Sequence, residues 1–214
     1  MEKLFVTRGS GNCFKPFLVS CLTGRNIDIV NVDLLAVHHR SRTFLSINPL
    51  GRVPYLLLED GDGIGESNAM LWLLAEGSKL LPGTVKDRAR SLQWMFFEQT
   101  RLEPFISPAR FLSHIAPDRG AGRGDEIAAW QGKAMAGLRI VNDHLQKSRF
   151  MLGDTFGITD IAIFGYVHLG HEAGIDMAAF PAVLAWIEQV QSLPGFQPLS
   201  MLCERASPFV REAA

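Results

Sequence analysis

Short apolar runs alternate with amphipathic stretches over the first 80 residues. Short apolar runs predict strands over 4–6, 28–34 (where Ile29, Val30 and Val32 are β-branched) and 53–58, and the glycines of 61–65 predict a hairpin with a very short fourth strand. Apolar residues at helical spacing predict helices over 12–24 and 66–75, with a short helix or turn at 41–45. This order of elements favours a compact α/β domain.

The second half of the chain carries only helical periodicity. Helices are expected over 86–111, 125–147, 159–171 and 182–192. Pro104 and Pro108 should bend or shorten the first of these, because proline lacks an N–H donor and clashes with the preceding turn. The Pro/Gly-containing stretch 78–83 is typical of a domain connector. We therefore expect domains at 1–80 and 86–214, with a less ordered tail after Pro198.

Cap residues are predicted at the starts of two helices, one in each half of the chain. Asn12 is a plausible N-cap for the first helix, and Gly24 is placed to end that helix. In the second half, Asp160 falls at the third position of a helix that begins after Gly157. From there its carboxylate can accept a hydrogen bond from the cap backbone, although glycine is a weaker cap than serine or threonine.

Composition and charge exclude several classes of partner. With 47% apolar and 20% charged residues the chain is an ordinary globular one, and a formal charge of -1 gives no reason to expect nucleic acid or an anionic membrane. The N-terminus lacks a signal-peptide pattern, and the best apolar run, 161–167, is too short to span a bilayer. Three cysteines without a CxxC motif favour a reducing cytoplasm over a disulfide framework.

Three segments in the expected order resemble those of soluble glutathione transferases. They are Ser10-Gly11-Asn12-Cys13, the stretch 48–54 followed by Glu66-Ser67, and the stretch 153–160. The similarity runs over about 3–202, and it points to a bacterial serine-type or Nu-like member. It implies a thioredoxin-like N-terminal domain of α+β type, followed by an all-helical C-terminal domain.

The resemblance also implies which residues bind glutathione, the expected co-substrate. Pro54 looks like the cis-proline of the thioredoxin-like fold, which would let the Val53 backbone pair with the cysteinyl amide. Ser67 is implied to hold the γ-glutamyl carboxylate at a helix N-terminus, and Glu66 to face the amino group. The residues implied to face the glycine carboxylate are His39, Arg40 and Arg52. Taken alone, Pro54 could be an ordinary edge-strand proline, and Glu66-Ser67 could simply cap a helix. The occurrence of all three segments in the expected order favours glutathione binding.

The catalytic requirement is an ionised glutathione thiol, because the thiolate is the nucleophile. Ser10 is the first choice for the stabilising donor, since serine-type members place a hydroxyl there. Asn12 could donate through its amide, or could serve only as a helix cap. Cys13 could form a mixed disulfide, but its position favours burial on the helix. No tyrosine occurs in this loop, which excludes a tyrosine-type mechanism.

The resulting hypothesis is a cytoplasmic glutathione transferase that acts on a small hydrophobic electrophile. A glutathione-dependent disulfide oxidoreductase and a non-catalytic binding protein remain as alternatives. Thr100, Arg101 and Leu102 replace the polar residues that related bacterial proteins often carry, so the electrophile stays unnamed. His168 and His171 lack the spacing of a zinc site, and no metal is expected. A homodimer is expected, with Met70, Trp94 and Phe97 as the apolar residues left exposed for it.

Overall fold

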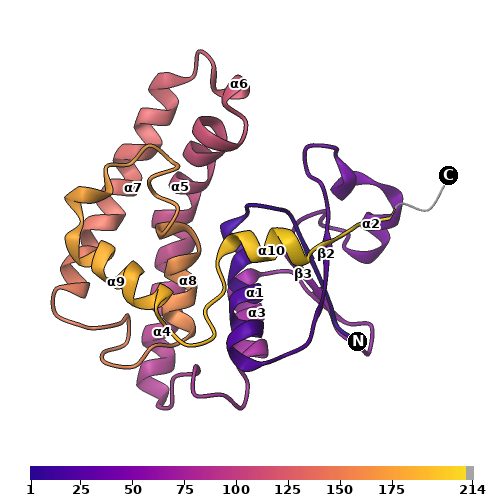
Figure 1. The fold of residues 1–214 in the computed structure, drawn as a ribbon, viewed down its shortest axis with the longest axis horizontal. Coiled ribbons are helices and arrows are strands. Elements are labelled where there is room, and N and C mark those ends of the chain that lie inside the picture. The colour runs from indigo at the N-terminus through magenta and orange to yellow at the C-terminus, as the bar shows by residue number, and fades with distance from the viewer. Residues whose placement is uncertain (211–214) are drawn as a thin grey trace. The chain divides into compact units, whose positions relative to one another are not determined.

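The computed structural model describes residues 1–210 and divides them into two compact units (Figure 1). The first unit combines Met1–Ser78 with the residues from Pro194 onward, and the second is Lys79–Leu193. The first boundary lies close to the expected residue 80. However, residues 194–210 belong with the α/β unit and not with the helical domain expected over 86–214, whose last four residues lie outside the described range.

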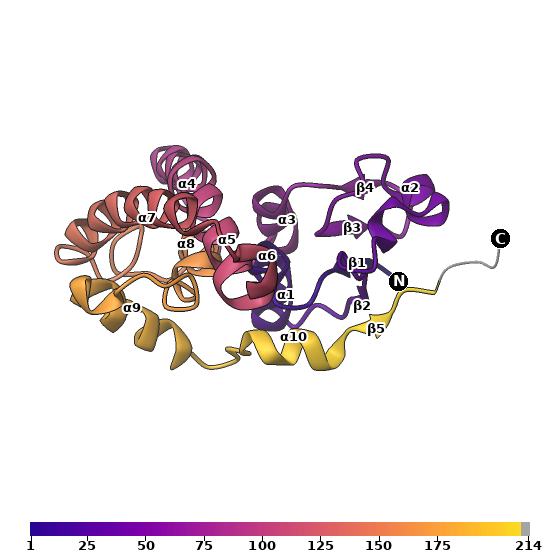
Figure 2. The same ribbon diagram turned by 90° about the horizontal axis from the view of Figure 1, so that it is seen from above.

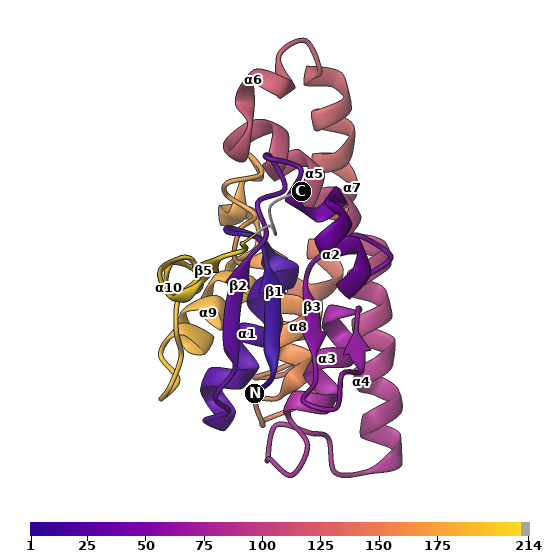
Figure 3. The same cartoon turned by 90° about the vertical axis from the view of Figure 1, so that its right-hand side faces the viewer.

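The first unit is built on a mixed sheet of five strands in the order β4-β3-β1-β2-β5. Its strands are β1 (Lys3–Val6), β2 (Asp28–Asn31), β3 (Tyr55–Leu57), β4 (Gly63–Ile64) and β5 (Ser207–Pro208). β1 is parallel to β2 and antiparallel to β3, and the three lie side by side in Figure 3. All four expected strands are present, whereas β5 was not predicted.

Helices cover both faces of this sheet. α1 (Gly11–Thr23) and α3 (Ser67–Leu74) pack on one face, and the short α2 (Arg42–Ile47) lies on the other (Figure 2). The N-cap of α1 is Ser10 and not Asn12, because the Ser10 Oγ accepts a hydrogen bond from the Cys13 N–H at 3.3 Å. Asn12 lies inside the first turn. At the other end, Gly24 caps α1 in the left-handed conformation, with φ 68°, as expected.

The second unit is helical throughout. Its helices are α4 (Val85–Phe97), α5 (Glu103–Arg110), α6 (Pro117–Gly120), α7 (Gly124–Leu145), α8 (Ile158–Val167) and α9 (Pro181–Gln191). The helix expected over 86–111 is interrupted by a wide π-type turn, Glu98–Leu102, after which Pro104 occupies the first turn of α5. N–H groups in the first turn of a helix have no acceptor within the helix, so the lack of an N–H on Pro104 costs no hydrogen bond there. α8 is buried along its whole length, and none of the helices within 1–210 is long and apolar enough to cross a membrane.

The C-terminal segment is ordered, contrary to expectation. α10 (Leu199–Arg205) packs against α1 with Leu202 buried, and β5 extends the sheet beside β2. The polar character of the segment suggested disorder, but Leu202 and Phe209 anchor it to the first unit.

The apolar residues expected to be exposed differ from those that are. Met70, on α3, is fully buried. Trp94 and Phe97 are half-buried, and the centroids of their rings lie 5.3 Å apart. The exposed apolar residues of α4 are instead Leu92, at 42% exposure, and Phe96, at 68%. The sequence pattern located the helix correctly but assigned the wrong face to solvent.

Candidate functional site

The expected site residues of the first unit gather at one end of the sheet. β1 and β3 are antiparallel with Phe5 opposite Tyr55, so the chain leaves β1 where it enters β3. Ser10 follows β1 by four residues, and Val53-Pro54 immediately precedes β3. The Val53-Pro54 peptide bond is cis, as expected. The sheet therefore brings the loop before α1 next to the segment before β3.

The N-terminus of α3 meets that of α1 at the same place. Ser67, which is 5% exposed, donates a hydrogen bond from its Oγ to the Asn12 Oδ1 at 3.3 Å. Glu66 occupies the N-cap position of α3 with an exposed side chain. Helix N-termini present N–H donors and a partial positive charge, so two of them together favour a bound anion.

A residue that sequence reasoning missed adds a positive charge to this region. Lys15 is fully buried on α1, and its Nζ lies 3.4 Å from the Oδ1 of Asn68, the residue after Ser67. A buried ammonium strengthens the attraction for an anion because the interior screens charge less than water does. The signal that could have found Lys15 is its spacing from Leu18 and Leu22, which places it on the apolar face of the helix.

Ser10 and Cys13 occupy different chemical environments. Ser10 is half-buried, and its hydroxyl uses a lone pair to cap α1, which leaves the O–H proton to be donated. Cys13 is fully buried, and its Sγ accepts a hydrogen bond from the Thr7 N–H at 3.3 Å. Burial raises the pKa of the Cys13 thiol to about 11, against which the bonds from Ser10 and Thr7 act only in part. Near neutral pH this thiol is uncharged and a poor nucleophile.

The three basic residues expected at the glycine end lie on the loops that flank α2. His39 and Arg40 lie in η1 (His38–Arg40), and Gly51, next to Arg52, packs against that turn. A Cβ on Gly51 would lie 2.9 Å from the His39 carbonyl oxygen, and its φ of 59° is left-handed, so glycine is required for this approach. Asn48 holds the loop by donating from its Nδ2 to the Arg52 carbonyl at 2.8 Å.

The charge of these three basic residues comes from the two arginines and suits the binding of a carboxylate. Arg40 and Arg52 are exposed, and His39 is half-buried. Burial, with a smaller contribution from the Arg40 charge, lowers the pKa of His39 below its usual value, so the imidazole is neutral near pH 7. The two guanidinium groups therefore carry the positive charge here.

The helical unit contains a buried carboxylate whose role is structural. Asp160 accepts hydrogen bonds from the Met151 N–H at 2.9 Å, the Gly157 N–H at 3.1 Å and the Trp186 Nε1–H at 3.0 Å. Burial raises the pKa of Asp160 to about 6, and these three donors limit the rise. The hydrogen bond from the Gly157 N–H to the Asp160 carboxylate is the one between the cap backbone and the third helical residue that the sequence predicted.

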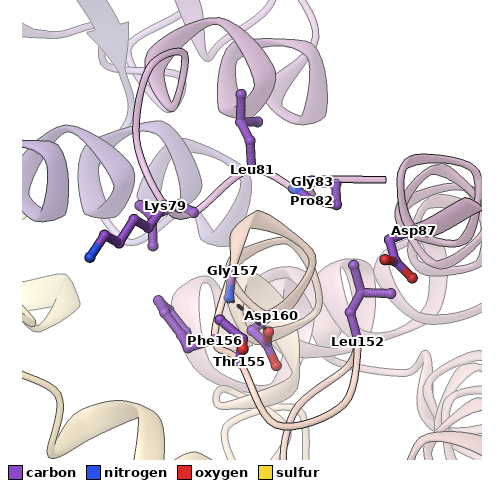
Figure 4. A pocket seen from close by; sticks show the side chains of 11 residues that line it. Lys79, Leu81, Pro82, Gly83, Asp87, Leu152, Thr155, Phe156, Gly157 and Asp160 are labelled. Carbon is purple, nitrogen blue, oxygen red and sulfur yellow. Dashed lines mark hydrogen bonds between the residues drawn. The ribbon is translucent and has the colours of Figure 1, made fainter. Parts of the chain in front are cut away.

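The same region explains the glycine at the cap position. The Ile158 N–H donates to the Leu80 carbonyl at 3.0 Å, and a Cβ on Gly157 would lie 2.7 Å from that oxygen. A serine or threonine at position 157 would therefore push the Leu80 backbone of the connector away from the start of α8. Figure 4 shows the pocket that the connector forms with the loop before α8, where Asp160 lies beside Gly157 and Phe156.

The two histidines after α8 do not form a metal site. The His168 Nδ1 is hydrogen-bonded to the Phe164 carbonyl, its ring stacks on the Phe164 ring, and burial lowers its pKa to about 4. His171 is exposed beside Glu172. Within residues 1–210 no group of three or more His, Cys, Asp or Glu side chains is arranged to hold a metal ion.

Known proteins resemble the chain along most of its length. The family models for the N-terminal and C-terminal domains of glutathione S-transferase match residues 9–76 and 124–189. Glutathione S-transferase 3 of Zea mays is 30% identical over 205 residues, which cover 91% of this chain and 91% of that protein. The disulfide-bond oxidoreductase YfcG of Escherichia coli K12 is 29% identical over 173 residues, which cover 78% of this chain and 79% of that protein.

Solved structures agree with these sequence relatives. The crystal structure of a glutathione S-transferase from Pseudomonas fluorescens Pf-5 superimposes with a TM-score of 0.89 at 35% identity. The alignment covers 92% of this chain and 98% of that one. The expected combination of a thioredoxin-like domain and a helical domain is thereby confirmed.

Proposed function

The chain belongs to the glutathione S-transferase family, and from this premise we propose that it binds glutathione and transfers the thiolate to a small hydrophobic electrophile. The observation that carries the proposal is the meeting of two helix N-termini, through Ser67 and Asn12, at the sheet end where Val53-Pro54 enters β3. This arrangement suits a ligand that is anionic and peptide-like.

Each part of glutathione has a place in the proposed site. The γ-glutamyl carboxylate lies at the N-terminus of α3, where the Ser67 hydroxyl turns from the Asn12 Oδ1 to donate to it and Glu66 faces the amino group. The Val53 backbone pairs with the cysteinyl amide, as an added strand would. The glycine carboxylate lies against the basic group of His39, Arg40 and Arg52. The negative charge at both ends of the tripeptide is thus met by positive potential.

The proposed chemistry follows the serine-type pattern. Ser10 donates its hydroxyl proton in a hydrogen bond to the thiolate, and the N-terminus of α1 adds its dipole. Asn12 is the alternative donor. Cys13 is the least suited of the three, because its buried thiol stays protonated near neutral pH.

Glutathione-dependent disulfide reduction is the second candidate, supported by the similarity to a disulfide-bond oxidoreductase. In that reaction two glutathione thiols become glutathione disulfide while the substrate disulfide becomes two thiols, so the same thiolate would be needed. A panel of electrophiles assayed beside a small disulfide distinguishes the two. Conjugation without disulfide reduction supports the transferase, and the reverse result supports the oxidoreductase.

The replacement Ser67→Ala tests whether glutathione binds at this place. It removes a hydrogen bond to a charged carboxylate, worth about 1.5–3 kcal/mol, so affinity should fall roughly tenfold or more. Titration calorimetry measures the change, with circular dichroism to check folding. Ser192→Ala is the matched control, since Ser192 is an exposed helix-end serine of the other unit and should leave the affinity unchanged. Unchanged binding in folded Ser67→Ala would remove Ser67 from the site.

A homodimer is part of the proposal. Leu92 and Phe96 lie one turn apart on α4 and are both exposed, which leaves an apolar strip open to water. We expect sedimentation equilibrium at micromolar concentration to give a dimer, and Phe96→Glu to shift it toward monomer. Val85→Glu is the control, because Val85 is 84% exposed at the start of the same helix. A monomeric wild-type protein would contradict the prediction.

A further inference from the structure

The C-terminal strand completes the unit that contains the proposed glutathione site. β5 runs parallel to β2 with Val30 paired to Ser207, and the Phe209 N–H donates to the Asn31 carbonyl at 2.9 Å. The Ser207 Oγ also donates to the Ile29 carbonyl at 3.1 Å. These bonds fix the position of Phe209 relative to the sheet.

The Phe209 ring completes an aromatic cluster on the α2 face of the sheet. Its centroid lies 6.2 Å from that of Phe5 and 5.7 Å from that of Phe44, and Phe5 and Phe44 are 5.7 Å apart. All three pairs are edge-to-face, an arrangement that adds to the stabilisation from apolar burial. Val53 and Tyr55, like Phe209, pack against the buried group of Phe5, Val32 and Phe44.

Phe44 connects this cluster to the basic loops. It is the buried residue of α2, and Ile47 of the same helix packs against the same cluster, so the attachment of this helix to the sheet centres on the Phe44 ring. The turn with His39 and Arg40 ends where α2 begins, and Asn48, which holds the Arg52 carbonyl, follows its last residue. A change in the position of Phe44 is therefore passed to both loops.

From this geometry we propose that Phe209 is a positioning residue for the glycine end of glutathione, an inference that rests on the proposed function. Phe209 holds Phe44, and through it α2, in the position that sets the two loops carrying His39, Arg40 and Arg52. Phe209 itself touches no part of the ligand. The γ-glutamyl end is bound at α3, which lies on the other face of the sheet, and does not depend on Phe209.

The test compares two ligands that differ at the glycine end. Phe209→Ala should weaken the binding of glutathione about five- to tenfold and leave the binding of γ-glutamylcysteine, which lacks glycine, within twofold of wild type. Calorimetry gives both affinities, and circular dichroism checks that the variant is folded. Val210→Ala is the control, because Val210 is 81% exposed beside Phe209 and should change neither affinity. Phe209→Leu keeps apolar volume, so it should fold and show a smaller loss of the same selectivity.

The outcomes separate this inference from the proposed function. Equal weakening of both ligands, or no weakening of either, in a folded variant would overturn the positioning role while leaving the glutathione site in place. If Phe209→Ala does not fold, the result for Phe209→Leu decides in the same way. Wild-type protein that binds neither ligand would overturn the proposed function itself.

Discussion

Replacing Ser10 by alanine should raise the pKa of the thiol of bound glutathione by about one to two and lower turnover about ten- to hundredfold near pH 6.5. A hydrogen bond to a charged group contributes about 1.5–3 kcal/mol, and each pKa unit corresponds to about 1.36 kcal/mol. Without the Ser10 hydroxyl the thiolate loses that stabilisation, so a smaller fraction of bound glutathione is ionised. The thiolate absorbance of bound glutathione, followed against pH, measures the shift directly.

A control is needed because Ser10 also caps α1. Ser10→Gly removes the hydroxyl but costs only a few tenths of a kcal/mol as a cap, and Ser10→Thr keeps both functions. If thiol activation is the role, the glycine variant should behave like alanine and the threonine variant like wild type. If the glycine variant instead keeps wild-type turnover, the alanine effect comes from helix capping.

The neighbouring variants decide between the three candidate activators. If Ser10→Ala leaves the titration midpoint and turnover unchanged while Asn12→Ala moves both, the amide is the activator. If Cys13→Ala alone abolishes activity, and a mixed disulfide is found by mass spectrometry, the protein exchanges thiols and the transferase proposal is wrong. Cys13→Ala in a folded protein is otherwise expected to keep activity, since this thiol is buried and protonated.

Replacing Asp160 by alanine should lower the free energy of unfolding by about 3–5 kcal/mol. The change leaves the Met151, Gly157 and Trp186 donors without their acceptor in the interior, and each unsatisfied buried donor costs about 1–3 kcal/mol. Urea unfolding measures the loss. Asp154→Ala is the control, because Asp154 is exposed in the preceding loop and should change stability by less than about 0.5 kcal/mol. A loss below about 1 kcal/mol in Asp160→Ala would show that water replaces the carboxylate.

The pH dependence of stability gives a second measurement of the same residue. Burial raises the pKa of the Asp160 carboxyl from its ordinary value of 3.8 to about 6, so the folded state binds the proton more tightly. The stabilisation that comes from proton binding at Asp160 is therefore fully present below about pH 4 and is lost as the pH rises through 6. In Asp160→Asn this part of the pH dependence should disappear.

Local signals located most of the fold and much of the proposed site. The buried run of β1 and the left-handed Gly24 each depend on residues near them in sequence, so the pattern was enough, whereas the cis bond before Pro54 was expected from the family resemblance. The position of Asp160 in its helix was equally local. In the site, the sequence also indicated that Cys13 would be buried.

What the sequence did not reveal depends on contacts between distant residues. β5 has two residues and pairs with a strand about 180 positions earlier, so no local pattern marks it. Lys15 is buried only because Asn68 and the neighbouring helix receive it, and a lysine is ordinarily expected in solvent. The burial of Met70 likewise depends on α1 covering α3 on its apolar side.

The division of the first unit between two distant stretches of chain sets an order of assembly. Residues 1–78 leave the ribosome first, but Leu202, β5 and Phe209 follow only after the whole helical unit has been made. Until then the outer edge of β2 has no neighbouring strand, and Phe5 and Phe44 lack the third ring. An open strand edge is a template for pairing with other chains. The α/β unit, although encoded first, is therefore completed last, and during synthesis its β2 edge is the surface on which a chaperone would act.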